Sequence, residues 1–136
     1  MIAYLLDTNH LSAALGDESD VYRRVLAARR GGLRIGTCAP VLCELAVGIE
    51  QTARREANWE ALRVFMRQIR IWPVDASVAR IYGQLYNELR AKGRVLSQVD
   101  MMVAALAQRL KLTVLTTDTD FAAVPDVRTE NWVQPH

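Results

Sequence analysis

The sequence predicts an α/β fold in which a mostly parallel central sheet lies between helices on both faces. Two observations support this prediction. Short, continuous apolar runs, which are typical of buried parallel strands, alternate along the chain with longer segments of helical periodicity. Acidic residues also follow the clearest of these runs, and ligands of parallel sheets gather beyond the carboxyl ends of the strands. The sequence therefore predicts the edge of the sheet at which a site should lie.

The chain opens with a predicted strand and helix. Residues 2–6 are continuously apolar, as expected of a buried strand, and Asp7 follows them directly. Thr8 or Asn9 can then cap the first turn of a helix. Asp7 is thus expected at the carboxyl end of a strand.

A second helix and strand precede a helix that carries an acidic residue. Residues 19–30 form a helical stretch that ends at two glycines, and residues 33–38 are predicted to be a strand. Pro40 then opens a helix that contains Glu44 and ends near Gly48.

The next segment is predicted to be a helix followed by an edge strand. Residues 54–70 carry a helical stripe of apolar side chains. Residues 71–74 are then expected to form a short strand, and because this strand contains Pro73 it should lie at an edge of the sheet.

Two helices and two strands complete the predicted fold. Helices are expected over residues 76–91 and 97–110, the first closed by Gly93. Residues 113–116 form the next strand, and residues 127–129 are a weaker candidate after a turn at a proline.

Length and composition indicate one soluble globular domain, residues 1–136. The chain has 51% hydrophobic and 24% charged residues and no low-complexity tract. The opening apolar run is interrupted by Asp7 and lacks a basic start, and no stretch approaches the roughly 18 apolar residues of a membrane span. We therefore expect a cytoplasmic protein without membrane contact.

The cysteines and histidines offer little chemistry. Cys38 and Cys43 lack the spacing of a zinc site and are expected to be buried, reduced thiols. His10 is expected on the surface of a helix, and the only other histidine ends the chain. Sequence motifs of dinucleotide sites, NTPases, serine hydrolases and zinc proteases are absent.

Four acidic residues, Asp7, Glu44, Asp100 and Asp118, stand where apolar segments meet a helix start or a loop. A carboxylate beside an apolar core is costly unless a cation offsets its charge, so the repeated placement indicates a bound divalent metal. Glu44 in particular has apolar neighbours that leave little of its helix for a solvated face.

Each acid also has a simpler interpretation. Asp7 could cap the helix that follows it, and Asp100 stands three residues after Ser97, close to the pattern of a capping box. Asp118 and Asp120 could be ordinary turn residues. The metal hypothesis depends on the four positions taken together.

The basic residues are compatible with an anionic substrate. If metal neutralises the four acids, 17 basic residues face 15 − 4 = 11 acidic residues. Arg90, Lys92 and Arg94 precede Asp100 and are candidates for substrate binding. The alternative for any cluster is a solvated helix face. The other basic residues that contribute much of the excess are Arg23, Arg24, Arg29, Arg30, Arg34, Arg54 and Arg55.

Four segments together resemble a known family: residues 5–9, Glu44-Leu45 with Gly48, Asp100 opening a helix that continues Val103-Ala104-Ala105, and residues 116–121. The chain resembles PIN-domain ribonucleases, and in particular the VapC toxins of bacterial toxin–antitoxin modules. The resemblance implies a PIN-like three-layer sandwich, Mg²⁺ or Mn²⁺ at the acidic cluster, and hydrolysis of structured RNA, most commonly tRNA. It also implies a homodimer that a cognate antitoxin inhibits.

The resemblance assigns roles by position. Asp7, Glu44 and Asp100 match three core acids of the family, and Asp118 is the first choice for the fourth, with Asp120 in reserve. The final list gives the hydroxyl and amide positions expected to orient the carboxylates. These are Thr8, Asn9 and Thr116, of which Asn9 is expected to cap the helix or position Asp7.

Two other classes of protein remain open at this point. A receiver-like domain or aspartate phosphatase also places acids at strand ends, but such a phosphatase would want an acid where this chain has Asn9. A catalytically silent PIN binding module is the second alternative. In the nuclease hypothesis a metal-activated water attacks phosphorus in line and leaves a 5′ phosphate and a 3′ hydroxyl.

Overall fold

The computed structural model describes residues 2–16 and 19–133, and its centre is a five-stranded sheet. The strands lie in the order β3-β2-β1-β4-β5, and all four pairings are parallel. Because the chain moves from β1 to one side and later returns to the other, β1 and β4 flank a topological switch point, where ligands of such sheets bind. The strands are β1 (Ala3–Leu6), β2 (Arg34–Cys38), β3 (Arg70–Trp72), β4 (Thr113–Leu115) and β5 (Thr129–Glu130).

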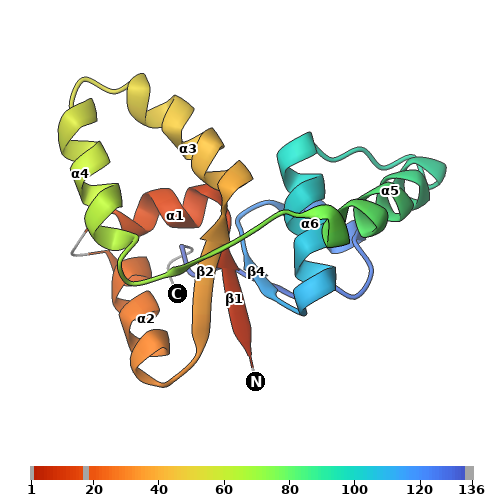
Figure 1. The fold of residues 1–136 in the computed structure, drawn as a ribbon, viewed down its shortest axis with the longest axis horizontal. Coiled ribbons are helices and arrows are strands. Elements are labelled where there is room, and N and C mark those ends of the chain that lie inside the picture. Colours follow the sequence, from red (N-terminus) through yellow and green to blue (C-terminus); the bar gives the residue numbers. More distant parts are fainter. Residues whose placement is uncertain (1, 17–18, 134–136) are drawn as a thin grey trace.

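Helices cover both faces of the sheet and confirm the predicted three-layer α/β fold. Figure 1 shows α1, α2 and α4 on one side and α5 and α6 on the other, with α3 rising from the end of β2. Helix α5 packs mainly against α6. The helices are α1 (Thr8–Ala14), α2 (Asp20–Arg30), α3 (Ala39–Glu50), α4 (Arg55–Phe65), α5 (Ala76–Ala91), α6 (Gln98–Leu110) and the short 3₁₀ helix η1 (Thr119–Ala123).

The core is built from β1, β4 and one face of α6. All four side chains of β1 and all three of β4 are buried, as the continuous apolar runs predicted. Helix α6 buries Met101 and the run from Val103 to Ala107, in which three alanines allow close approach to the sheet. These contacts fix the strand ends at which the acids lie.

Several predicted boundaries differ from the structure. Helix α4 ends at Phe65, so the prediction of a helix to residue 70 was wrong; a turn intervenes and Arg70 already belongs to β3. Pro73 lies just beyond β3, which is an edge strand as expected. The last strand, Thr129–Glu130, begins two residues later than predicted.

Two single-residue predictions were also wrong. His10 is fully buried rather than on the surface, and its Nε2 accepts a hydrogen bond of 2.8 Å from the backbone N–H of Trp132. Cys38 is buried as predicted, but Cys43 is exposed on α3. Among the described residues, no helix has both the length and the apolar character that a membrane span requires.

Candidate active site

Asp7 lies at the carboxyl end of β1, at the switch point of the sheet. Its backbone N–H donates to the carbonyl of Leu115 in β4 at 3.0 Å. Its Oδ1 accepts from the N–H of Thr8 at 2.8 Å, and its Oδ2 accepts from the hydroxyl of Thr116 at 2.9 Å. Asp7 itself is therefore the N-cap of α1, so the prediction that Thr8 or Asn9 caps this helix was wrong.

Burial sets the ionisation of Asp7. Only 7% of the residue is exposed, and this burial raises the pKa of its carboxyl group above the ordinary value. The two hydrogen bonds act in the opposite direction, while the negative charges of Glu44 and Asp118 raise the pKa further. Asp7 is thus electrostatically coupled to two of the other predicted acids.

Glu44 lies on α3 and reaches the site from the neighbouring strand's helix. Contrary to the prediction of a buried glutamate, the residue is exposed. Its Oε1 accepts a hydrogen bond from the hydroxyl of Thr8, the residue that follows Asp7. Thr8 therefore links two acids that are 37 positions apart in the sequence, in accordance with the expected orienting role.

Asp100 stands in the first turn of α6, where Ser97 caps the helix and accepts from the Asp100 N–H at 3.1 Å. Partial burial, followed by the charges of Asp7 and Asp118, raises the pKa of Asp100 to about 7. The capping interpretation and the site interpretation are thus both correct for this segment. A carboxyl group with such a pKa lies close to other negative charge.

Asp118 begins the loop after β4 and caps η1. Its backbone N–H donates to the Thr116 hydroxyl at 3.0 Å, and its Oδ1 accepts from the N–H of Asp120 at 2.8 Å. The charge of Asp118 acts on both Asp7 and Asp100, whereas Asp120 is exposed and is not among the groups that shift either pKa. This geometry favours Asp118 over Asp120 as the fourth acid.

Comparison with known proteins gives this arrangement a family. The model of the PIN domain matches residues 4–127, which include Asp7, Glu44, Asp100 and Asp118. The chain belongs to the PIN-domain family. This assignment favours the nuclease interpretation over a receiver domain or an aspartate phosphatase.

Relatives of this PIN domain carry the VapC name. Ribonuclease VapC2 of Rickettsia felis is 29% identical over 130 residues, which cover 95% of this chain and 97% of that protein. Ribonuclease VapC4 of Mycobacterium tuberculosis is 32% identical over 101 residues, covering 73% and 78%. The solved structure of Rickettsia felis VapBC2 bound to a promoter DNA fragment has a TM-score of 0.87 at 26% identity, covering 96% of this chain and 99% of that chain. Within its family, the chain belongs with the VapC ribonucleases.

The donor set of the PIN site fits a hard divalent cation. Four carboxylates and the hydroxyls of Thr8 and Thr116 supply only oxygen ligands, which Mg²⁺ and Mn²⁺ prefer. Among residues 2–16 and 19–133, no Lys or Arg forms an ion pair with any of the four acids. The raised pKa values of Asp7 and Asp100 therefore reflect negative charge that lacks a cation.

The carboxylates are grouped but not closed around one point. Across the described part of the chain, no three Asp, Glu, His or Cys side chains lie in an arrangement that could hold a metal ion. Mutual repulsion accounts for this spacing, and the side chain of Glu44 is turned to the Thr8 hydroxyl. Ligation of one ion would draw the four side chains together by rotation about their own bonds.

The remaining predicted residues lie around the acids. The side-chain amide of Asn9 donates to the hydroxyl of Thr117 at 2.7 Å, so Asn9 joins α1 to the loop after β4 instead of capping the helix or positioning Asp7. Arg90 and Arg94 line a hollow of about 300 Å³ that also includes Met101, the neighbour of Asp100. Lys92 points to Glu88, with 3.8 Å between Nζ and Oε1.

Sequence reasoning missed one residue that supports the site. Thr37 in β2 is fully buried, and its hydroxyl donates to the carbonyl of Leu6 at 2.8 Å, which anchors the strand end before Asp7. A threonine within an apolar strand gives no sequence signal, because strands favour threonine for its shape alone.

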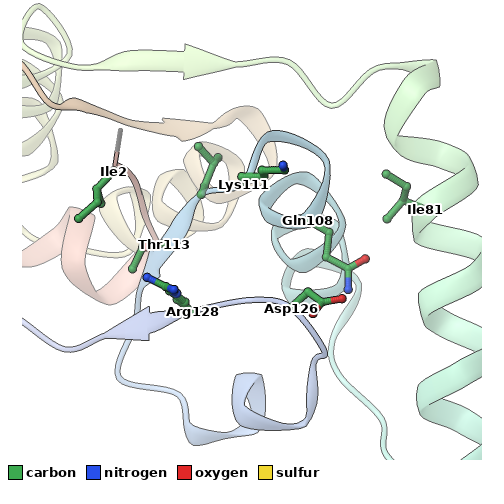
Figure 2. Close-up of a pocket in the computed structure, with 8 residues that line it drawn as sticks. Ile2, Ile81, Gln108, Lys111, Thr113, Asp126 and Arg128 are labelled. Atoms are coloured by element: carbon green, nitrogen blue, oxygen red, sulfur yellow. The ribbon is translucent and has the colours of Figure 1, made fainter.

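Hollows elsewhere on the molecule contain none of the predicted site residues. Figure 2 shows one of about 690 Å³ at the opposite, amino end of β4, where Gln108, Lys111 and Thr113 face Asp126 and Arg128. The acids thus occupy the carboxyl edge of the sheet, and this hollow occupies the other edge.

Proposed function

We propose that this PIN-domain ribonuclease is a Mg²⁺- or Mn²⁺-dependent endoribonuclease that acts as the toxin of a toxin–antitoxin pair. One observation carries the metal dependence: Asp7, Glu44, Asp100 and Asp118 converge at the switch point with raised pKa values at Asp7 and Asp100 and no ion-pair partner among the described residues. A divalent cation is the ligand that best relieves this charge and attracts the phosphate oxygens of RNA.

The residues of the chain have distinct roles in this proposal. Asp7, Glu44, Asp100 and Asp118 hold the metal, which when bound supplies Lewis acidity toward a phosphodiester and its attacking water. Thr116 and Thr8 fix the orientation of the Asp7 and Glu44 carboxylates through the hydrogen bonds described above. Asp120 is the reserve for the fourth position.

Substrate binding is proposed for the cations near α6. Arg90 and Arg94 border the hollow beside Met101, and tRNA or another structured RNA is the proposed substrate class. Lys92 is the third candidate, although its ammonium group is directed to Glu88. Neutralising Arg90 and Arg94 should weaken RNA binding and flatten its dependence on salt.

A cognate antitoxin is the proposed protein partner, and the active form is proposed to be a homodimer in the cytoplasm. The support for the antitoxin is that the similar solved structures are toxin–antitoxin complexes, including VapBC of Salmonella typhimurium at a TM-score of 0.84. A hollow of about 420 Å³ between α1 and α3, lined in part by Leu15, Leu45 and Ile49, offers an apolar surface for such a partner.

The test compares RNA cleavage by wild type, Asp7→Asn and a control variant in Mg²⁺, in Mn²⁺ and in chelator. The control is Asp20→Asn, which removes an exposed acid on α2. We expect cleavage by wild type and the control only with metal, and a loss of about a hundredfold or more for Asp7→Asn. Equal cleavage in all three solutions would remove the metal hypothesis.

A further inference from the structure

Four arginine side chains line one hollow at the amino end of the sheet, the edge opposite the acids. The hollow has a volume of about 580 Å³. Arg34 and Arg70 come from neighbouring strands, while Arg29 and Arg67 come from the ends of the preceding helical segments. No acidic side chain is among its lining residues.

The fold brings these four side chains together through two similar turns. Arg34 is the first residue of β2 and Arg70 is the first residue of β3, and the two strands pair in parallel. Gly32 adopts a φ of +82°, which lets the chain turn back from α2 to β2 and brings Arg29 beside Arg34. The turn after α4 brings Arg67 to the same place.

The charges of these arginines are not compensated nearby. Among residues 2–16 and 19–133, none of the four forms an ion pair. Arg67 exerts a weaker influence on Glu60, whose pKa it helps to lower. The neighbouring hollow in Figure 2 differs, because there Lys111 and Arg128 share the surface with Asp126.

Cations at the ends of helices have a general explanation, because they complement the helix dipole. That explanation covers Arg29 in the last turn of α2. It does not cover Arg34 and Arg70, which begin strands, and Arg34 is only partly exposed. Their convergence therefore indicates a ligand with several negative charges.

We propose that this arginine hollow, formed by Arg29, Arg34, Arg67 and Arg70, binds backbone phosphates of the RNA at a distance from the scissile bond. The inference rests on the proposed function for its choice of RNA. Guanidinium groups match phosphate oxygens in pairs of hydrogen bonds, and an open, polar hollow with four of them suits a strand that passes over it. The five residues of β2 that separate the two edges span about 16 Å at 3.3 Å per residue.

This separation predicts a dependence on RNA length. Phosphates along one strand of a duplex advance about 3.4 Å each, so roughly five nucleotides are needed to bridge the two edges. A tetranucleotide can occupy the acids alone, whereas a structured RNA of tRNA size can occupy both sites.

The experiment measures the Kd of a structured RNA at several salt concentrations in an Asp100→Asn background, which prevents cleavage. The variant Arg34→Gln/Arg70→Gln is compared with Arg80→Gln/Arg109→Gln, which removes the same charge from exposed positions on α5 and α6. We expect the first pair to raise the Kd about fivefold or more and to reduce the salt slope by about 1.4, and the second pair to change neither. In the active background, cleavage of a tetranucleotide should be unchanged by either pair.

Three results would overturn the inference. If both pairs give the same Kd and salt slope, the hollow does not bind RNA, while tetranucleotide cleavage still supports the proposed function. If the first pair loses binding to polyglutamate but keeps RNA binding, the hollow receives an acidic protein instead. If wild type neither binds RNA nor cleaves the tetranucleotide, the proposed function fails, and this inference fails with it. Thermal unfolding of each variant verifies that it is folded.

Discussion

The hydroxyl of Thr116 donates a 2.9 Å hydrogen bond to Oδ2 of Asp7 and accepts one of 3.0 Å from the N–H of Asp118. One buried side chain thus fixes a carboxylate at the end of β1 and the backbone of the loop after β4. The two acids that it contacts are 111 positions apart in the sequence. Their relative position depends on this hydroxyl group.

Thr116→Val should therefore reduce activity more than its effect on folding suggests. Valine has nearly the same shape but can neither donate to Asp7 nor accept from Asp118. We expect metal affinity to fall about tenfold to a hundredfold, and the free energy of unfolding to fall by about 1–3 kcal/mol. Calorimetry with Mn²⁺ and denaturant unfolding measure the two effects. Thr129→Val, at an exposed position in β5, is the control and should alter neither. Unchanged metal affinity in Thr116→Val would contradict an orienting role.

The raised pKa of Asp100, about 7, predicts that metal-free protein loses stability as pH rises. Below about pH 4 the group is protonated in both the folded and the unfolded state. Between about pH 4 and 7 the unfolded state releases the proton and the folded state retains it, so unfolding becomes easier. Above about 7 the loss is complete.

Asp100→Asn should remove this dependence, because an amide carries no charge at any of these pH values. In chelator, the Tm of wild type minus that of Asp100→Asn should become more negative between pH 4 and 7. Added Mg²⁺ should stabilise wild type more than the variant at pH 8. A constant difference in Tm across that range would show that Asp100 does not retain its proton.

The sequence predicted the architecture because the relevant signals are local. Continuous apolar runs identified β1 and β4, and Ser97 and the glycine pair at 31–32 identified helix boundaries. The convergence of the acids followed from topology, since the carboxyl ends of parallel strands share one edge. The resemblance of four short segments to one family supplied the order of the acids.

What the sequence did not predict depends on contacts between distant residues. The exposure of Glu44 results from the direction in which α3 leaves the sheet, and its partner Thr8 belongs to another helix. Helix α4 stops at Phe65 because the chain must turn to enter β3, although apolar spacing continues to Ile69. Neither effect is visible in the local pattern.

His10 illustrates the same point and gives a further prediction. Its burial depends on Trp132, which lies 122 positions later, contacts Tyr4 with ring centroids 4.9 Å apart, and stacks under Arg24. Burial, and then the charge of Arg24, lowers the pKa of His10 to about 4. Acidification from about pH 6.5 to 4 therefore adds a proton to His10 in the unfolded state only, which favours unfolding.

The measurement is the free energy of unfolding of wild type and His10→Gln across that pH range. Glutamine offers an oxygen to the Trp132 N–H but does not titrate. We expect a lower stability of the variant near pH 7, because the ring is lost from a buried site, and a smaller decrease on acidification. Parallel pH profiles for the two proteins would mean that His10 is already protonated in the fold.

Gly36 predicts the largest effect of a single methyl group on stability. It lies in β2 opposite Arg70 of β3, and a Cβ added there would come within 2.9 Å of the Arg70 carbonyl carbon and closer still to its oxygen. Because the obstacle is backbone in a paired strand, it cannot rotate away, and β3 would have to shift. Gly36→Ala should therefore lower the free energy of unfolding by about 2–4 kcal/mol. Gly83→Ala is the matched control, since its position in α5 has no atom within 4 Å of the added carbon. Removing a glycine from a helix interior should raise stability by about 0.5–1 kcal/mol. Denaturant unfolding of the two variants gives opposite signs if β2 and β3 pack as described, and a stable Gly36→Ala protein would refute this close approach.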